Sequence, residues 1–196
     1  GNWNVDSFFD ITYRIDFIGK PGTILGGHSG STTGTIRMGT GQALPTPGPC
    51  TVVNDGSGTV NLPPPGCGYV SPNDLHLMID GLPPGTNIAV AAEHRDFFNV
   101  THAPATGGEI EHFSSNLGLT LTGTGTLAGF QRTISMQAQC ESHTGPRANG
   151  AIVQSFDTDM FMIQGQLPIG DPDFDLLRIT AAHCATPETR LQMMSS

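Results

Sequence analysis

The sequence predicts an all-β protein, specifically a two-sheet antiparallel β-sandwich. Short apolar runs are separated throughout by turn residues, with 26 glycines and 15 prolines in 196 residues, and this punctuation is typical of sandwiches. Two segments near opposite ends are also alike, Val5-Asp6-Ser7-Phe8 and Val153-Gln154-Ser155-Phe156. Each leads into a turn region and a second short run, at residues 35–38 and 176–179, which is consistent with a duplicated strand-turn-strand unit.

The individual strands are predicted from alternating apolar and polar residues. Residues 8–18 form the clearest strand and residues 35–38 a shorter one. Residues 75–79 and 88–100 are expected to pair as a hairpin across a Pro-Pro-Gly turn. The threonine-rich alternation of residues 108–127 favours a strand over a helix. Three further runs bring the expected total to about nine or ten strands, namely residues 130–140, 152–167 and 176–181.

One domain is expected over residues 1–184, because a chain of this length can bury a core without additional cross-links. Between about residues 40 and 73 the composition shifts to Pro, Gly, Thr and Asn, and Pro63-Pro64-Pro65 forms a stiff segment. We interpret this region as an insertion. Residues 185–196 are interpreted as a C-terminal tail.

The chain contains four cysteines, which are Cys50, Cys67, Cys140 and Cys184. Four cysteines allow three pairings. The pairing of Cys50 with Cys67 and of Cys140 with Cys184 is favoured, because it needs one local link across the insertion and one contact between late strands. The alternative is four reduced, buried thiols, and a zinc site is disfavoured because no CxxC spacing occurs. Since disulfides mark oxidising compartments, a secreted or cell-surface location is favoured.

The charge balance excludes several kinds of partner. Eight Lys and Arg residues are outnumbered by 17 Asp and Glu residues, for a net charge of −9. The cations are scattered, so nothing in the sequence indicates binding to nucleic acid or to an anionic membrane surface. No apolar stretch approaches the roughly 20 residues that span a bilayer, so membrane insertion is not expected.

An acidic turn is the first candidate site. Asp171, Asp173 and Asp175 alternate along the chain, and alternate carboxylates on a turn can converge on calcium, which accepts six to eight oxygen ligands. The run lacks the glycine and the terminal glutamate of an EF-hand loop. A solvated turn whose charges face water is the favoured interpretation, and a bound calcium ion is the alternative.

Histidines and glutamates form a second candidate site. Pairing within a hairpin could bring Glu93-His94, His102 and Glu111-His112 together as a transition-metal site. Histidines at strand ends are more often surface or hydrogen-bonded residues, and this interpretation is favoured. Glu109 and Glu111 alternate onto one strand face. The paired carboxylates of a glycoside hydrolase must lie roughly 5 to 10 Å apart across a cleft, and the sequence does not give that distance.

Two short segments resemble parts of hydrolase sites. The segment from Thr180 to Cys184 resembles the one around the general-base histidine of chymotrypsin-like serine proteases, but in that family the aspartate and the nucleophile follow the histidine. The segment from Gly27 to Ser31 resembles the nucleophile elbow of the α/β-hydrolases, but it lacks the final glycine and the following helix. We therefore interpret the two segments as a strand end and a loop, and expect no catalytic residues.

The segment Asp6-Ser7-Phe8-Phe9-Asp10 resembles a recurring segment of secreted, repeat-containing bacterial surface proteins of unassigned function. The order of later elements, from Glu109-Ile110-Glu111-His112 to the second similar segment at Ser155-Phe156, fits such repeats, although the second copy lacks the second phenylalanine. The resemblance implies an exported, β-rich module with no catalytic residues to carry over.

These observations predict a secreted or cell-surface structural or interaction module that is not an enzyme. Its expected partners are copies of itself or other surface proteins, joined through edge strands. The alternative is a calcium-assisted carbohydrate-binding module that holds a glycan with the acidic turn and an exposed aromatic residue. A serine hydrolase built on Ser29 and His183 is the least favoured function.

Overall fold

The computed structural model describes residues 1–6, 8–39, 50–56, 67–70, 75–77, 83–146, 153–183 and 188–193. These residues form twelve strands and one 3-10 turn. The strands are β1 (Trp3–Asp6), β2 (Phe8–Gly19), β3 (Ser29–Gly39), β4 (Cys50–Val52), β5 (Tyr69–Val70), β6 (Leu75–Leu77), β7 (Ile88–Ala105), β8 (Gly108–Gly123), β9 (Gln131–Thr144), β10 (Val153–Gln166), β11 (Phe174–His183) and β12 (Glu188–Met193), and the turn is η1 (Gly125–Leu127).

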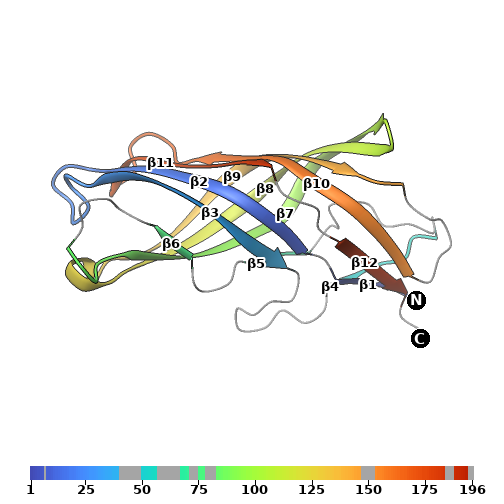
Figure 1. Cartoon of the computed structure of the whole chain (residues 1–196), viewed down its shortest axis with the longest axis horizontal. Coiled ribbons are helices and arrows are strands. Elements are labelled where there is room, and N and C mark those ends of the chain that lie inside the picture. Colours follow the sequence, from blue (N-terminus) through green and yellow to red (C-terminus); the bar gives the residue numbers. More distant parts are fainter. Residues whose placement is uncertain are drawn as a thin grey trace.

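All described strand pairs are antiparallel and belong to one sheet, whose order is β11-β2-β3-β5-β7-β8-β9-β10-β12-β1-β4. The predicted all-β, antiparallel class is confirmed. The arrangement differs from two separate stacked sheets, because β11 pairs with β2 on one side and with β10 on the other. The sheet therefore curls around its core, as Figure 1 shows.

The two similar sequence segments occupy related places. The first segment runs from the end of β1 to the start of β2, and the second segment begins β10. The hairpins that follow, β2–β3 and β10–β11, are joined by the β2–β11 pair. The N-terminal parts of the two segments are separated by a single strand, because β12 pairs with β1 on one side and with the start of β10 on the other. Residues 188–193 are thus a strand within the sheet, and their interpretation as part of a tail was wrong.

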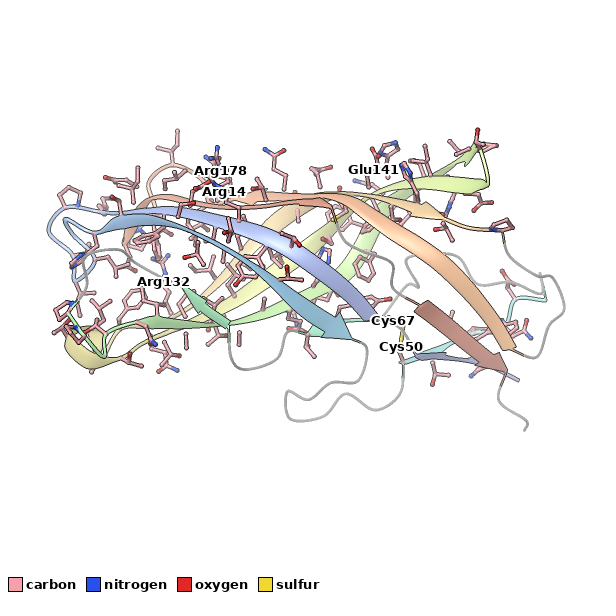
Figure 2. The ribbon with its side chains drawn as sticks, viewed as in Figure 1. Arg14, Cys50, Cys67, Arg132, Glu141 and Arg178 are labelled. Carbon is pink, nitrogen blue, oxygen red and sulfur yellow. A yellow bond between two sulfur atoms is a disulfide. The ribbon has the colours of Figure 1, made fainter. Side chains whose placement is uncertain are left out.

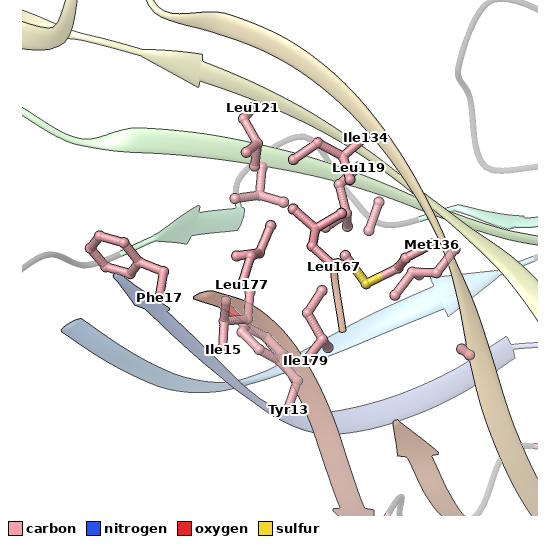
Figure 3. Close-up of a cluster of buried hydrophobic side chains, with 14 of the residues drawn as sticks. Tyr13, Ile15, Phe17, Leu119, Leu121, Ile134, Met136, Leu167, Leu177 and Ile179 are labelled. Atoms are coloured by element: carbon pink, nitrogen blue, oxygen red, sulfur yellow. The ribbon is translucent and has the colours of Figure 1, made fainter. Parts of the chain in front are cut away.

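The core lies inside the curl, between β2 and β11 on one side and β8 and β9 on the other (Figure 3). Alternation sends every second residue of each strand inward, and along β9 these residues are consistently buried from Ile134 to Thr144. The apolar side chains that meet in the core include Tyr13, Ile15, Phe17, Leu119, Leu121, Ile134, Met136, Leu167, Leu177 and Ile179.

A disulfide lies within the predicted insertion. Cys50 and Cys67 are bonded, with their Cα atoms 5.5 Å apart, as predicted (Figure 2). The bond connects β4, which pairs with β1, to the residues that precede β5, which pairs with β7. The Pro63–Pro65 segment lies outside the described residues.

The outer face of the curled sheet carries an ion-pair ladder. Asp16 on β2 accepts hydrogen bonds from Arg14 Nε and Arg178 Nη2, each at 2.8 Å, and the two arginines lie close together in Figure 2. The bond from Arg178, followed by those from Arg14 and Ser31, lowers the pKa of Asp16 from 3.8 to about 2. This ladder ties β11 to β2 across one of the pairs that close the curl.

Candidate functional site

The hairpin of β7 and β8 projects beyond the curled sheet, and its tip lies at the upper right of Figure 1. We call residues 101–112 the distal hairpin. Its strands pair Thr101 with His112, His102 with Glu111 and Pro104 with Glu109. On the far side of β8, Glu111 also pairs with Ser142 of β9. The distal hairpin therefore collects histidines and glutamates on adjacent strands.

Two bulges in β7 set the direction of the distal hairpin. The register of β7 against β8 shifts between Arg95 and Phe98 and again between Phe98 and Thr101. Asp96 and Asn99 have φ values of 52° and 53°, in the left-handed region that Asn and Asp tolerate better than other non-glycine residues. A bulge bends its strand and increases the local twist. The second shift restores the alternation, so that His102 again faces the same side as Glu111.

Three side chains meet on the inner face of the distal hairpin. His102 Nδ1 lies 3.9 Å from Glu111 Oε1 and 4.0 Å from Glu109 Oε2. All three potential ligand atoms lie within 4.8 Å of one another. The side chain of Glu111 is 0% exposed, whereas those of His102 and Glu109 are 32% and 41% exposed. An imidazole nitrogen and two carboxylates are suitable ligands for a divalent transition metal.

Two hydroxyl groups fix the buried carboxylate. Ser142 Oγ and Thr144 Oγ1 donate hydrogen bonds to Glu111 Oε2 at 3.0 and 2.8 Å. Both donors are buried on β9, where the inward positions change from apolar residues to Cys140, Ser142 and Thr144 toward this end. The carboxylate is thereby oriented with Oε1 toward His102.

A second group lies on the opposite face of the same strands. Glu141 is near two histidines, since its Oε2 lies 3.5 Å from His112 Nδ1 and its Oε1 lies 3.1 Å from His143 Nε2. Figure 2 shows Glu141 on the outside of the sheet. The sequence interpretation that grouped His112 with His102 was therefore wrong, because adjacent residues of a strand face opposite sides.

A third group is sealed in the core. His94 is 2% exposed, and its Nε2 is hydrogen-bonded to Ser115 Oγ and lies 3.6 Å from Cys140 Sγ. Phe97 packs edge-on against the imidazole with ring centroids 5.3 Å apart. Burial lowers the pKa of His94 from 6.5 to about 4, so the ring is neutral at pH 7. His94 lies on the core side of the bulges and does not join the His102 group.

Cys140 is a buried thiol and forms no disulfide. The predicted bridge from Cys140 to Cys184 is therefore not present, and Cys184 itself lies outside the described residues. The physical reason is the inward direction of Cys140 in the middle of the sheet, where its sulfur lies 3.7 Å from Ser115 Oγ. Sequence reasoning placed it at a strand end, but β9 continues to Thr144.

At the acidic turn, where a bound calcium ion was the alternative interpretation, an arginine of β9 contacts the aspartates. Arg132 Nη1 donates to Asp171 Oδ1 at 2.7 Å and also to Asp173 Oδ2. Asp171 Oδ1 further accepts the backbone N–H groups of Asp173 and Phe174. Burial alone would raise the pKa of Asp171, but these bonds, led by the one from Arg132, lower it. The guanidinium thus neutralises two of the three predicted ligands, and Asp175 is exposed.

The two segments that resemble hydrolase motifs are far apart. Ser29 pairs with Ile18 of β2, whereas His183 pairs with Thr12, six residues away along the same strand. At roughly 3.3 Å per residue the separation is about 20 Å. A hydrogen bond between a nucleophile and its base needs about 3 Å, so Ser29 and His183 do not form a catalytic pair.

Sequence reasoning found part of the inner group. The less favoured interpretation of the histidines, in which hairpin pairing brings His102 and Glu111 together, agrees with the register of β7 and β8. Sequence reasoning did not identify Ser142 and Thr144 as partners of Glu111, although their alternation with Glu141 and His143 places them on the face of Cys140. It also missed Arg132, which is separated by 39 residues from Asp171.

Comparisons with protein-family models, curated proteins and solved structures gave no match. Within the described residues, no helix is long and apolar enough to cross a membrane. The function must therefore be argued from the geometry of the distal hairpin and of the three side-chain groups.

Proposed function

We propose that this chain is a structural and interaction module of an exported protein, and that the distal hairpin is its contact element for a second copy of the chain. The observation that supports this proposal is the open edge of β7. Among the described residues, β7 from Arg95 to Ala105 pairs only with β8, whereas its earlier part also pairs with β5 and β6.

An open strand edge offers backbone N–H and C=O groups to a strand of another molecule. The residues from Thr101 to Pro104 are exposed, and the hairpin projects away from the core, so a neighbouring chain can approach it (Figure 1). Pro104 has no N–H group and limits the pairing to the residues before it. Contact between the same hairpins of two copies would form a symmetric dimer.

A binding role agrees better with the geometry than a catalytic one. The one described serine–histidine contact, between Ser115 and His94, is sealed in the core, and Ser29 and His183 are far apart. The Cys50–Cys67 disulfide supports an oxidising compartment and hence export. For the alternative role in calcium-assisted glycan binding, Arg132 already neutralises two carboxylates of the acidic turn.

The proposal is tested by the mass of the purified chain in solution, measured by analytical ultracentrifugation over a range of concentrations. We expect a dimer that dissociates on dilution. Ala103→Lys places a charge on the open edge, a substitution that natural edge strands use to prevent pairing, and we expect it to weaken the dimer by at least about tenfold, or 1.4 kcal/mol.

The matched control is Ala128→Lys, because Ala128 is also exposed and follows η1 at the opposite end of the molecule. It should leave the dimerisation constant unchanged. A chain that is monomeric at every concentration, or a dimer that both variants weaken equally, would contradict the assignment. Measurements with calcium and with a chelator separate out any contribution of the acidic turn.

A further inference from the structure

We infer that the inner face of the distal hairpin is a binding site for a divalent transition-metal ion of the zinc class, with His102, Glu109 and Glu111 as ligands. The inference goes beyond the proposed contact role and does not rest on it, since all three ligands belong to one chain. It follows from the spacing, the donor types and the support of these residues.

The spacing matches the size of a coordination sphere. Zinc binds imidazole nitrogen and carboxylate oxygen at about 2.0–2.2 Å, so two ligand atoms of one ion are separated by at most about 4.4 Å. The distances from His102 Nδ1 to Glu111 Oε1 and Glu109 Oε2 are 3.9 and 4.0 Å, within this limit. The three ligand atoms lie within 4.8 Å of one another. A displacement of each ligand atom by well under 1 Å is therefore sufficient to bring all three to bonding distance of one ion.

The donor types select the metal. Calcium and magnesium prefer oxygen ligands alone, whereas an imidazole together with carboxylates suits zinc and related ions of the first transition row. Two carboxylates and a neutral imidazole also leave a divalent ion without net charge at the site. Because His102 and Glu109 are partly exposed, the ion can enter from solvent and retain an open coordination position.

The support of Glu111 resembles the outer shell of known metal sites. Metal-bound carboxylates are usually held by further hydrogen bonds, which orient them. Here Ser142 and Thr144 both donate to Oε2 of Glu111 and direct Oε1 toward His102. The pairing of β8 with its two neighbouring strands also positions these side chains, since His102 and Ser142 are the two cross-strand neighbours of Glu111.

The test is isothermal titration of the full chain with Zn²⁺ after removal of metal by a chelator. We expect saturable binding of one ion per chain, and no comparable binding of Ca²⁺ or Mg²⁺. His102→Ala and Glu109→Gln each remove a ligand at a partly exposed position and should weaken binding by about 100-fold or more. Thr144→Val removes only an outer-shell bond and should weaken it by about 10- to 100-fold.

His112→Ala is the matched control, because His112 lies on the same hairpin but faces the opposite side with Glu141 and His143. It should leave the affinity for Zn²⁺ unchanged. If His112→Ala weakens binding and His102→Ala does not, the ion lies on the outer face and the assignment is overturned. Absence of saturable binding by a folded chain overturns it as well.

The same titration on Ala103→Lys separates this site from the contact role of the hairpin. Retention of zinc binding by the monomeric variant is expected, since none of the ligands comes from a second copy. A wild-type chain that dimerises but binds no zinc contradicts this inference alone, and a wild-type chain that binds zinc but stays monomeric contradicts the proposed contact role alone.

Discussion

His94 makes the stability of the folded chain depend on pH in a defined window. Its pKa is lowered by burial to about 4, from 6.5, so the unfolded chain binds a proton between these values and the folded chain does not. Stability is therefore complete above pH 6.5 and decreases as the pH falls toward 4. At about 1.4 kcal/mol per pKa unit, the free energy of unfolding should fall by up to about 3 kcal/mol.

Urea unfolding at a series of pH values checks this prediction. His94→Gln should flatten the dependence between pH 6.5 and 4, whereas His28→Gln, at a partly exposed loop residue, should not. Asp16 does not interfere in this window, because its pKa is lowered from 3.8 to about 2 and its contribution is lost only below about pH 3.8. Equal slopes in the wild type and His94→Gln would contradict the assignment.

At the scale of single residues, the sequence predicts the face to which a side chain points better than the residues that it contacts. Alternation from Ile88 through Val90 and Ala92 already places His94 on the buried face of its strand. Its contacts with Ser115 and Cys140 depend on the register of three strands, which alternation leaves undetermined. The same limit applies to the acidic turn, where the spacing of aspartates indicates a cation but does not reveal that Arg132 supplies it.

At the scale of elements, the bulges of β7 give a prediction about Asn99. Its φ of 53° lies in the left-handed region, which costs a side chain with a Cβ about 1 kcal/mol relative to glycine, less for Asn. Asn99→Ala should therefore lower the free energy of unfolding by about 1 kcal/mol, whereas Asn99→Gly should leave it unchanged or raise it slightly. Chemical denaturation distinguishes them, and equal losses in both variants would show that the side chain of Asn99, not its backbone, matters.

Individual strands were predicted well where their own residues alternate, as in residues 8–18 and 88–100. β12 was missed because its short sequence, Glu188 to Met193, carries no clear apolar alternation. Its stability as a strand comes from pairing with β1 and β10, which are remote in sequence. Tertiary pairing thus overrides weak local preference.

At the scale of the whole molecule, the sequence indicates which faces are buried but not how the sheet closes. A period of two is expected in a sandwich and in a curled sheet alike, because both bury one face of each strand. The difference lies in β11, whose partners β2 and β10 come from opposite ends of the chain. The same closure places the hairpin β2–β3 beside the hairpin β10–β11. The two parts of the chain that are similar in sequence are therefore neighbours in the fold.

The corner formed by β1, β4 and β12 joins the rest of the sheet through β10 and through the Cys50–Cys67 disulfide. Trp3 is the single tryptophan of the chain and is fully buried on β1, so its fluorescence reports on the surroundings of this strand of the corner. Far-UV circular dichroism reports on the whole sheet. Coincident urea transitions by the two probes are expected for the wild type, because both connections make unfolding cooperative.

Removing the disulfide should separate the two transitions. In the chain-entropy model, a link across a sequence separation of 17 stabilises the fold by about 3 kcal/mol, and its loss removes one of the connections between the corner and the core. In Cys50→Ala/Cys67→Ala we therefore expect the Trp3 fluorescence to change at a lower urea concentration than the circular dichroism. Cys140→Ala is the control, since it removes a core thiol without touching either connection and should shift both transitions together. If the transitions stay coincident in the double variant, the remaining connections between the corner and the core are sufficient for cooperativity, and the disulfide stabilises without coupling.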